Sequence, residues 1–409
     1  MGCARNVKRV LSPLDEELGL VPGQFTPQVQ AAMSRLGSKM PFEQAVEEIW
    51  DGRRIHLSEG TIRQTTYRHG KAAEALIEAE VERLEKEAPE AAAKPGKLLV
   101  SADGAMVPLV NGEWREVKSV AVGEVADEWV VKKGEIIVKT KEISYFSRSY
   151  RAREFERGAL AELHRRGIDN ADTVIAVNDG AEWIQSFIDY HCPQAVRIID
   201  FAHTQEYLAQ AGKAIWGEET PLFEQWYESA CHRLKHKPPQ RTIANLRLLQ
   251  QKVKSDERAA EVDGALFYIQ KRKEMMDYAY FRRLGYPIGS GCVESGHKVV
   301  AHSRLKGAGM RWAPQHVDPM LSLRNLVCNK RWDEGWQQIV TQHQQQRRKA
   351  PRRSTPEEQP DPSEPLTFTT LEQKGLLPKA ANETKLKRTS EDHPWRRGFW
   401  PTKESWRWN

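Results

Sequence analysis

The sequence predicts an α/β fold in which one open β-sheet is combined with helical regions before, within and after it. At Lys97 the helical pattern gives way to strand-like apolar runs, and three of these follow one another. From residue 151 onward helical and strand-like segments alternate, as in parallel strands joined by helices. A chain of 409 residues has room for roughly two to three domains with a buried core.

Residues 1–70 are predicted to form a helical region that reads DNA. Helical periodicity begins at Pro27, and Ser58 supplies an N-cap for a last, short helix that ends at Gly70. Two helices joined by a turn are the arrangement of a helix-turn-helix reader, and a small bundle that only packs on the sheet is the alternative. The side chains of the last helix that suit contacts with DNA are Arg63, Gln64 and Arg68.

Residues 71–96 are rich in Ala and Glu, and we expect a helical connector that ends at Pro95 and Gly96. A short coiled-coil seam for a dimer is the alternative interpretation of this segment.

The sheet itself is predicted within residues 97–201. Three strands come first and form an antiparallel meander, and a helix, a strand, a helix, a strand and a further helix follow. This order resembles that of a ribonuclease-H-like domain. The predicted segments after the meander are a helix over 151–167, a strand over 173–178, a helix over 181–190, a strand over 195–200 and a helix from 201.

Residues 202–285 are helical in character, with a polar break at 236–239, and are predicted to be an insertion in the core. The core resumes over 286–335 with a glycine turn and a helix that carries Glu294. Residues 336–409 are predicted to be a basic, partly disordered tail. The tail ends in tryptophans that either dock onto the body or a partner subunit or stay unstructured, namely Trp395, Trp400, Trp406 and Trp408.

Composition excludes several classes of protein. No apolar run is long enough to span a bilayer, and the start of the chain lacks the apolar segment of a secretory signal, so we expect a cytoplasmic, nucleoid-associated protein without membrane contacts. The five cysteines include no C-x-x-C pair, which argues against a disulfide framework and against a complete zinc site. Most of them are expected to be small buried hydrophobes, although Cys3 would fit a metal ribbon upstream in longer relatives.

The positive charge of the chain is unevenly distributed. The formal net charge is +6, but the segment 298–353 alone holds twelve Lys and Arg residues against three Asp and Glu residues. Such a composition favours contact with phosphates, while an ordinary solvated basic surface is the alternative.

Three acidic residues stand in small motifs framed by glycine: Asp103 in SADGAM, Asp179 in NDGAEW and Glu294 in GSGCVESGHK. The two aspartates are predicted at the C-terminal tips of strands, where ligands gather in an open sheet. Three carboxylates brought together can hold two Mg²⁺ (or Mn²⁺) ions, and such a pair catalyses phosphoryl transfer. The chain is therefore interpreted as an enzyme of the nuclease type.

Together with DFAH at 200–203, these motifs resemble the DDE transposases of bacterial insertion sequences, most closely the Mutator-like and ISKra-type group. The separations of about 75 and about 115 residues between the acidic residues suit a ribonuclease-H-like core with a helical insertion before the glutamate. The resemblance covers residues 10–335. It implies that Asp103, Asp179 and Glu294 hold the two ions.

The resemblance also implies the partners and the reaction. Such enzymes bind the terminal inverted repeats of their element, cleave its strands and join a freed 3′-hydroxyl to target DNA, and a homo-oligomer is expected in the synaptic complex. Two alternatives within the same lineage are a stand-alone ribonuclease-H-like nuclease and a domesticated DNA-binding protein. A glycosidase with two carboxylates is disfavoured because the chain lacks an aromatic sugar platform.

Asp200 and His203 match a signature found in several transposase families, and we expect His203 to orient the scissile phosphate or to donate to it, with Asp200 supporting the histidine. The alternative is an N-cap aspartate with a histidine in the first turn of a helix. His297 is expected about one turn from Glu294. Trp183 and Trp312 could stack on an unpaired base, but core packing is favoured for both. The residues predicted to contact backbone phosphates are Lys298, Arg304, Lys306 and Arg311.

Overall fold

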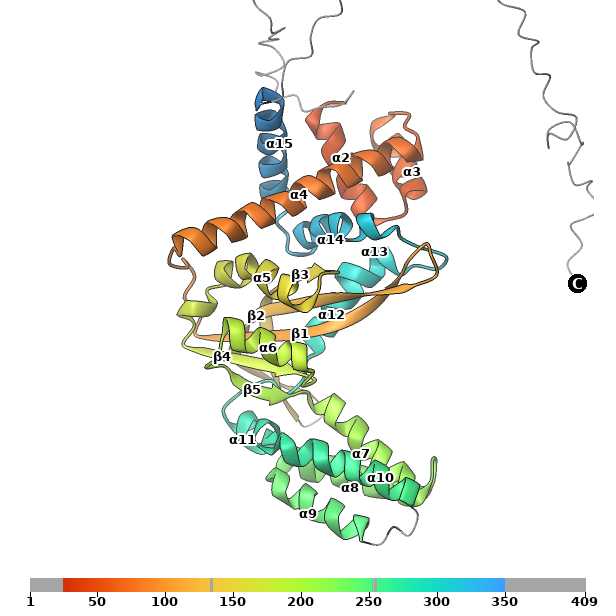
Figure 1. Ribbon diagram of the computed structural model, residues 1–409, viewed down its shortest axis with the longest axis vertical. Helices are drawn as coiled ribbons and strands as arrows, with labels where there is room; N and C mark the ends of the chain where they lie inside the picture. Colours follow the sequence, from red (N-terminus) through yellow and green to blue (C-terminus); the bar gives the residue numbers. More distant parts are fainter. Residues whose placement is uncertain (1–24, 133–134, 252, 254–255, 350–409) are drawn as a thin grey trace, which may run out of the picture. The chain divides into compact units, whose positions relative to one another are not determined.

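A five-stranded mixed β-sheet with the strand order β3-β2-β1-β4-β5 forms the core of the fold (Figure 1). The computed structural model describes residues 25–349 except 133–134, 252 and 254–255, and these residues belong to one compact unit. The first three strands are antiparallel, whereas β4 and β5 run parallel to β1, so the predicted mixed α/β sheet is confirmed. The strands are β1 (Lys97–Pro108), β2 (Trp114–Lys132), β3 (Glu135–Arg148), β4 (Thr173–Asn178) and β5 (Val196–Ile199).

Alternate residues of β1 face opposite layers of the structure, as the period of a strand requires. Leu98 and Val100 pack in a cluster with Phe155 of helix α5 and Phe187 of helix α6 on one face of the sheet. Leu99 belongs to the cluster on the other face. The sheet is therefore buried on both faces near β1. The helices on the first face are α5 (Ala152–Arg165) and α6 (Glu182–His191), and the short 3-10 turn η1 (Ile168–Asn170) precedes β4.

From residue 25 onward the described part of the N-terminal region contains three helices, and the last of them is much longer than predicted. α4 has 29 residues and is continuous from its N-cap Ser58 to Glu87. It therefore includes most of the segment expected to be a separate connector. The prediction of a short second helix, as in a helix-turn-helix, is wrong in length. Glycine at position 70 lets this helix lie against the backbone of Pro319, since a Cβ there would stand 2.5 Å from its carbonyl oxygen. The helices are α2 (Pro27–Lys39), α3 (Phe42–Arg53) and α4 (Glu59–Glu87).

The segment between β5 and the return to the sheet is helical, as predicted, and its polar break lies between the end of α8 and the start of α9. Apolar side chains from these helices share a cluster with Ile175 and Ile199 of the sheet, so the insertion packs directly on β4 and β5 (Figure 1). Its elements are α7 (Phe201–Trp216), α8 (Pro221–His236), α9 (Pro239–Gln250), α10 (Asp256–Lys271), η2 (Lys273–Met276) and α11 (Tyr278–Arg283).

The chain then returns to the sheet through a helix interrupted by a π-helical turn, η3, which directly follows the predicted glutamate helix. The last helix, α15, continues to Lys349, so the tail predicted to start at residue 336 begins with ordered helix. The four C-terminal tryptophans lie outside the described residues. The elements are α12 (Gly291–Gly296), η3 (His297–His302), α13 (Ser303–Leu305), α14 (Pro314–Cys328) and α15 (Trp332–Lys349).

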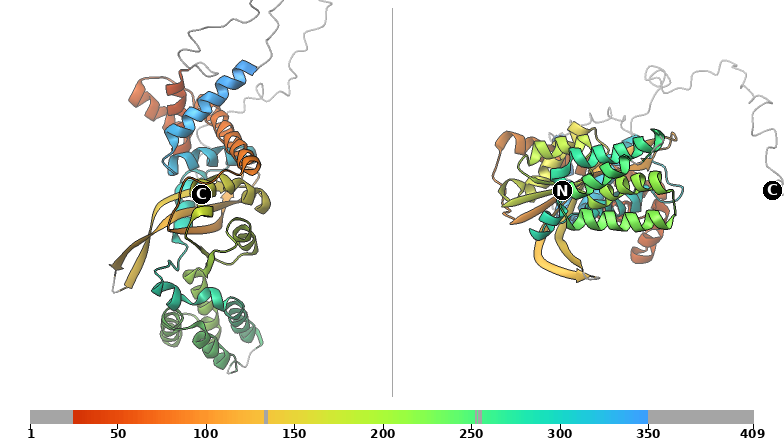
Figure 2. Two further views of the ribbon diagram at one scale, coloured as in Figure 1. Left: turned by 90° about the vertical axis from the view of Figure 1, so that its left-hand side faces the viewer. Right: turned by 90° about the horizontal axis from the view of Figure 1, so that it is seen from below.

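The strands β2 and β3 are longer than their neighbours. β1 pairs with β2 from Trp114 to Glu124, and beyond that point β2 pairs with β3 alone. Their distal ends form a two-stranded arm that extends away from the other strands (Figure 2). Within the described ranges, no helix combines the length and apolarity needed to cross a bilayer.

Candidate active site at the carboxyl end of the sheet

Three aspartates lie at one level of the sheet because the strand registers align them. β1 and β4 pair with an offset of 76 residues, and the same offset continues past the ladder, where Ala102 N donates to the side chain of Asn178. This offset brings Asp103 level with Asp179. β4 and β5 pair with an offset of 21 residues, which brings Asp179 level with Asp200. We call Asp103, Asp179 and Asp200 the acidic row.

Asp103 lies inside β1 rather than at its tip, because this strand continues to Pro108 alongside β2. The ladder between β1 and β4, however, ends at Val100 and Ala176. The prediction of a strand tip is therefore wrong for β1 as a whole, although Asp103 does lie where β1 has passed the end of its parallel neighbour. Its carboxylate is 37% exposed and accepts a hydrogen bond of 2.7 Å from the backbone N of Gly104.

Two serines extend the polar level across the antiparallel strands. Asp103 pairs with Ser119 of β2, and Ser119 pairs with Ser147 of β3. Residues directly opposite each other in an antiparallel pair share a face. The two hydroxyl oxygens are 2.7 Å apart, and both side chains are fully buried. The sheet therefore carries a polar level from β3 to the end of β5.

His297 lies over this level and contacts both of its halves. Its Nδ1 is 3.3 Å from the hydroxyl of Ser119, and its Nε2 is 3.4 Å from Oδ2 of Asp103. The residue is 4% exposed, and Nε2 is buried without a well-formed hydrogen bond. Since buried polar atoms normally have a hydrogen-bond partner, this nitrogen is available to hold the Asp103 carboxylate in position.

Glu294 lies on α12, which contacts β1, β2 and β3. Gly296 permits this close approach, because a Cβ at that position would stand 2.7 Å from the ring of Tyr145. On the opposite side of the helix Glu294 is exposed, and its Oε1 is 3.4 Å from the hydroxyl of Ser290. The π-helical turn starts three residues later at His297, and such turns are frequent at functional sites.

Both carboxylate oxygens of Asp200 accept hydrogen bonds from backbone N–H groups. Oδ1 accepts from the backbone N of His203 at 2.7 Å, and Oδ2 accepts from the backbone N of Ser290 at 2.6 Å. The residue is 4% exposed and is the N-cap of α7. The N-cap interpretation left open by the sequence is therefore confirmed. Asp200 joins the start of the insertion to the loop before Glu294.

His203 remains partly exposed in the first turn of α7. Its Nδ1 is 3.3 Å from a carboxylate oxygen of Glu206, and its ring meets those of Tyr207 and Tyr268 edge to face. No contact between its ring and Asp200 is found among the described residues; the link between the two is the backbone N of His203.

Asp179 is held through its backbone by the insertion. The hydroxyl of Tyr268 on α10 donates to the carbonyl oxygen of Asp179 at 2.7 Å, and the Arg272 guanidinium lies 4.1 Å from the Tyr268 ring. One carboxylate oxygen of Asp179 accepts from the backbone N of Ala181 at 2.8 Å. Gly180 makes this turn possible, since it has a φ of +87°, which favours glycine. The insertion thus fixes the turn that carries the second aspartate.

Taken as a set, Asp103, Asp179 and Glu294 offer only oxygen donors, which suits magnesium. Each of the three is at least partly accessible to solvent. In the described part of the chain, however, no group of three or more His, Cys, Asp or Glu side chains is arranged to hold a metal ion. The donor chemistry fits the expected ions, and the ligand set stays a prediction.

The predicted phosphate contacts divide into surface and interior residues. Lys298, Lys306 and Arg311 are exposed. Arg304 is only 2% exposed and donates from Nε to the carbonyl oxygen of Gly37 at 2.8 Å. Burial lowers the pKa of Arg304 to about 10. The prediction that Arg304 contacts DNA is therefore wrong, because its guanidinium is committed to the end of α2.

The predicted base-reading residues of α4 divide in the same way. Arg63 and Gln64 are exposed, and Arg63 forms an ion pair with Glu59 one turn earlier. Arg68 instead points inward and donates to Oε1 of Gln30 at 2.7 Å. Burial lowers the pKa of Arg68. Arg68 is half-buried and joins α4 to α2, and its predicted contact with DNA stays a prediction.

Of the two tryptophans predicted to lie in the core, Trp312 is buried and Trp183 is partly buried. Trp312 is 5% exposed, and the Arg304 guanidinium lies 4.8 Å from its ring centroid. Trp183 packs against the cluster around Phe155, with the two ring centroids 5.8 Å apart. The favoured core interpretation is thus confirmed for Trp312, and Trp183 is partly buried in the same manner.

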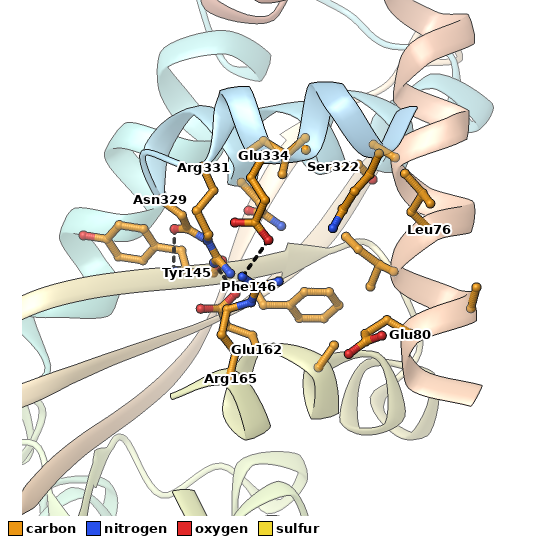
Figure 3. Close-up of a pocket in the computed structure, with 18 of the residues that line it drawn as sticks. Leu76, Glu80, Tyr145, Phe146, Glu162, Arg165, Ser322, Asn329, Arg331 and Glu334 are labelled. Carbon is orange, nitrogen blue, oxygen red and sulfur yellow. Dashed lines mark hydrogen bonds and ion pairs between the residues drawn. The ribbon is translucent and has the colours of Figure 1, made fainter. Parts of the chain in front are cut away.

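A cavity of about 440 Å³ lies between α4, α5, β3, α14 and α15, away from the acidic row (Figure 3). Tyr145 and Phe146 line it, and an ion pair between Arg331 and Glu162 lies at its edge. None of Asp103, Asp179 and Glu294 lines this cavity. The size of this cavity alone therefore does not identify it as the candidate active site.

The sequence interpretation missed the residues that organise the site rather than those that bear its charges. Ser119, Ser290 and Tyr268 have no motif of their own, and each is recognised only through a contact with a distant segment. For Ser290, the glycines on both sides of it were the one available signal.

No known protein family matches this chain, and none of the curated proteins is significantly similar to it.

Proposed function

We propose that this chain is a DNA transposase of the DDE type with a ribonuclease-H-like core, which binds terminal inverted repeats and carries out strand cleavage and strand transfer. The observation that supports it most is the acidic row, in which neighbouring strands bring aspartates to one level, together with the contacts that α12, the helix that carries Glu294, makes with the first three strands. The element order and the strand order of the sheet also agree with the ribonuclease-H-like expectation.

The proposal assigns metal binding to Asp103, Asp179 and Glu294. When bound, two Mg²⁺ or Mn²⁺ ions would neutralise charge on the scissile phosphate and align the attacking oxygen. His297 acts as a positioning residue, because its buried Nε2 is 3.4 Å from Asp103 and limits where that carboxylate can turn. Ser290 acts as a positioning residue for Glu294, because its hydroxyl is 3.4 Å from Oε1 of Glu294.

Asp200 is proposed to act indirectly. It ties the N-terminus of α7 to the Ser290 loop, so that the insertion and the Glu294 helix keep a fixed relation. His203 is the nearby side chain with an accessible ring, and it is proposed to contact the DNA phosphate. The exposed basic residues Lys298, Lys306 and Arg311 would bind the backbone of the same DNA.

The test uses purified protein and duplex DNA that carries the inverted repeats flanking its gene. We expect Asp103→Asn, Asp179→Asn and Glu294→Gln each to abolish Mg²⁺- or Mn²⁺-dependent strand cleavage while binding to the repeat persists. Glu182→Gln, which removes an exposed carboxylate on α6, is the matched control and should cleave like the unmodified protein.

Three outcomes would change the proposal. Cleavage that persists in all three variants would remove the assigned site. Cleavage without joining of the 3′-hydroxyl end to a second DNA would instead indicate a stand-alone nuclease. Binding without any cleavage by the unmodified chain would point to the domesticated DNA-binding protein.

A further inference from the structure

An exposed apolar patch lies at the end of the hairpin that β1 and β2 form. Ala102 is buried in the cluster beneath α5 and α6, but Met106, which points to the same face of β1 four residues later, is exposed. Trp114 at the start of β2 is 55% exposed, and Val110 in the turn between the strands is exposed as well. We call Met106, Pro108, Val110 and Trp114 the hairpin patch.

The pairing of the two strands makes the hairpin patch continuous. Trp114 lies opposite Pro108, and Met106 lies opposite Glu116, so Trp114 and Met106 are diagonal neighbours on one face of the hairpin. Long and aromatic side chains in such diagonal positions reach one another. The patch is therefore one surface with a tryptophan ring in it, and it differs from the single exposed apolar residues that any protein surface carries.

Cations border the Trp114 ring. The ammonium of Lys306 lies 5.6 Å from the centroid of this ring, and Lys306 is itself exposed. Arg311, also exposed, belongs to a segment that is hydrogen-bonded to the hairpin, because Trp312 N donates to Pro108 O at 3.1 Å.

Acidic residues are present at the hairpin too, but they lie to the side of the ring. Glu116 forms an ion pair with Lys118 farther back on β2, and Glu113 is exposed in the turn. The contact that the structure gives to the Trp114 ring is the one with Lys306. The surface around Trp114 thus combines an accessible aromatic ring with an accessible cation.

The hairpin patch and the acidic row share strand β1. Pro108, which pairs with Trp114, is five residues beyond Asp103, or about 17 Å along the strand. Five nucleotides span about this length at the spacing of B-form DNA. The β4 ladder ends at Val100, and the segment of Trp312 reaches β1 again at Leu109, so in the described chain this edge of β1 is open between them. A strand of DNA held at Asp103 can cross the open edge toward Trp114.

We propose that the hairpin patch stacks on an unpaired base of the DNA strand that lies at the acidic row, with Trp114 as the stacking ring and Lys306 at the adjoining phosphate. Aromatic rings beside cations are the usual platform for single-stranded nucleic acid. A protein partner is disfavoured by size, since a stable interface buries about 800 Å² on each side, whereas a buried aromatic side chain supplies about 150–250 Å². The inference rests on the proposed function and deepens it by naming the contact of an unpaired base.

The first test measures binding of a fluorescently labelled oligothymidylate by anisotropy, with EDTA present so that metal ions do not contribute. We expect Trp114→Ala to weaken binding by about tenfold, the size of one contact between a base and an aromatic ring. Trp114→Phe keeps an aromatic ring and should retain most of the affinity.

Tyr190→Ala is the matched control, because Tyr190 on α6 is an aromatic residue with the same exposure, 56%, and lies outside the hairpin patch. This variant should bind the oligonucleotide like the unmodified protein. Circular dichroism checks that every variant is folded.

A second test locates the contact. An oligothymidylate with one 5-iododeoxyuridine is irradiated in complex with the unmodified protein, and the crosslinked peptide is identified by mass spectrometry. We expect the crosslink in the peptide that contains Trp114. Its absence from that peptide would refute the contact.

Other results would also overturn the inference. They are unchanged affinity of Trp114→Ala for the oligonucleotide, an equal loss in Tyr190→Ala, an equal loss in Trp114→Phe, and a larger loss for duplex than for single-stranded DNA. A change in sedimentation of Trp114→Ala without any loss of DNA binding would assign the patch to a contact between protein copies instead.

A failure of the proposed function has a different signature. It would appear as absent Mg²⁺-dependent cleavage by the unmodified chain, while Trp114→Ala still loses single-strand binding. Conversely, cleavage by the unmodified chain together with unchanged oligonucleotide binding by Trp114→Ala would refute the stacking contact and leave the proposed function in place.

Discussion

Two regions of this molecule are rich in charged residues, but they use the charges in opposite ways. At the carboxyl end of the sheet, Asp103 is 37% exposed and its carboxylate contacts the protein through few groups. At the contact between α2, η3 and α14, the guanidinium groups of Arg304 and Arg324 are buried and donate to backbone carbonyls. The first region leaves a charged group accessible to a ligand, whereas the charged groups of the second region are hydrogen-bonded inside the fold.

The difference has a structural cause. Arg304 donates to Gly37 O and Arg324 to Ser38 O, and both acceptors lie in the last turn of α2, where carbonyl groups lack partners within the helix. Arg324 also donates to Val300 O in the π-helical turn, where the ordinary ladder is interrupted. A basic residue near a helix end can therefore be a structural donor, and basic composition alone overestimates the number of positive charges available at the surface.

The largest effect is expected when the buried charge is removed. Arg304→Ala takes away the hydrogen bond to Gly37 and the stacking of the guanidinium between Phe42 and Trp312, so it should lower the free energy of unfolding by about 3 kcal/mol. Lys306→Ala, two residues later on the surface, should change it by less than about 0.5 kcal/mol. Urea unfolding followed by circular dichroism measures both. Equal effects would erase the distinction between the two regions.

A smaller effect separates two members of the acidic row. Asp200→Ala leaves two backbone N–H groups, of His203 and Ser290, without their acceptor and should cost about 2 kcal/mol. Asp103→Asn should leave stability within about 0.5 kcal/mol, because its carboxylate is partly exposed. Thermal unfolding of the two variants decides. A stable Asp200→Ala protein would show that this residue is not the brace inferred from its contacts.

A third effect, of similar size, concerns pH. His69 is fully buried beside Arg68 and His343, and burial lowers its pKa from 6.5 to about 3. The unfolded chain takes up a proton below pH 6.5 while the folded chain does not, so stability is lost as the pH falls from 6.5 toward 3. Between pH 7 and pH 5 this loss amounts to about 2 kcal/mol.

His69→Gln should remove that part of the pH dependence. Because other buried groups such as His191 titrate in both proteins, the measured quantity is the difference between the unfolding free energies of the two proteins at each pH. A difference that stays constant from pH 7 to pH 5 would mean that His69 is protonated in the folded protein, contrary to the burial of its ring.

Much of the fold could be predicted from local sequence, since the periodicity of apolar residues indicates strands and helices. The strand over 173–178 and the helix break at 236–239 were predicted at their observed positions. The length of α4 was not, because Gly70 looks like a helix end in sequence, whereas in the structure it is a close contact with Pro319. In the local sequence, a glycine that ends a helix cannot be told from a glycine that permits a close contact.

The candidate site divides along the same line. Sequence by itself determined which carboxylates stand beside glycines and which strands precede them, because such motifs are local. Only the tertiary structure decided that both carboxylate oxygens of Asp200 accept hydrogen bonds from backbone amides, and that His297 lies close to Asp103. It also decided that Arg304 and Arg68 form hydrogen bonds within the protein. The physical reason is that burial and hydrogen bonding of a polar side chain depend on segments far away in the chain, and no local pattern of residues records them.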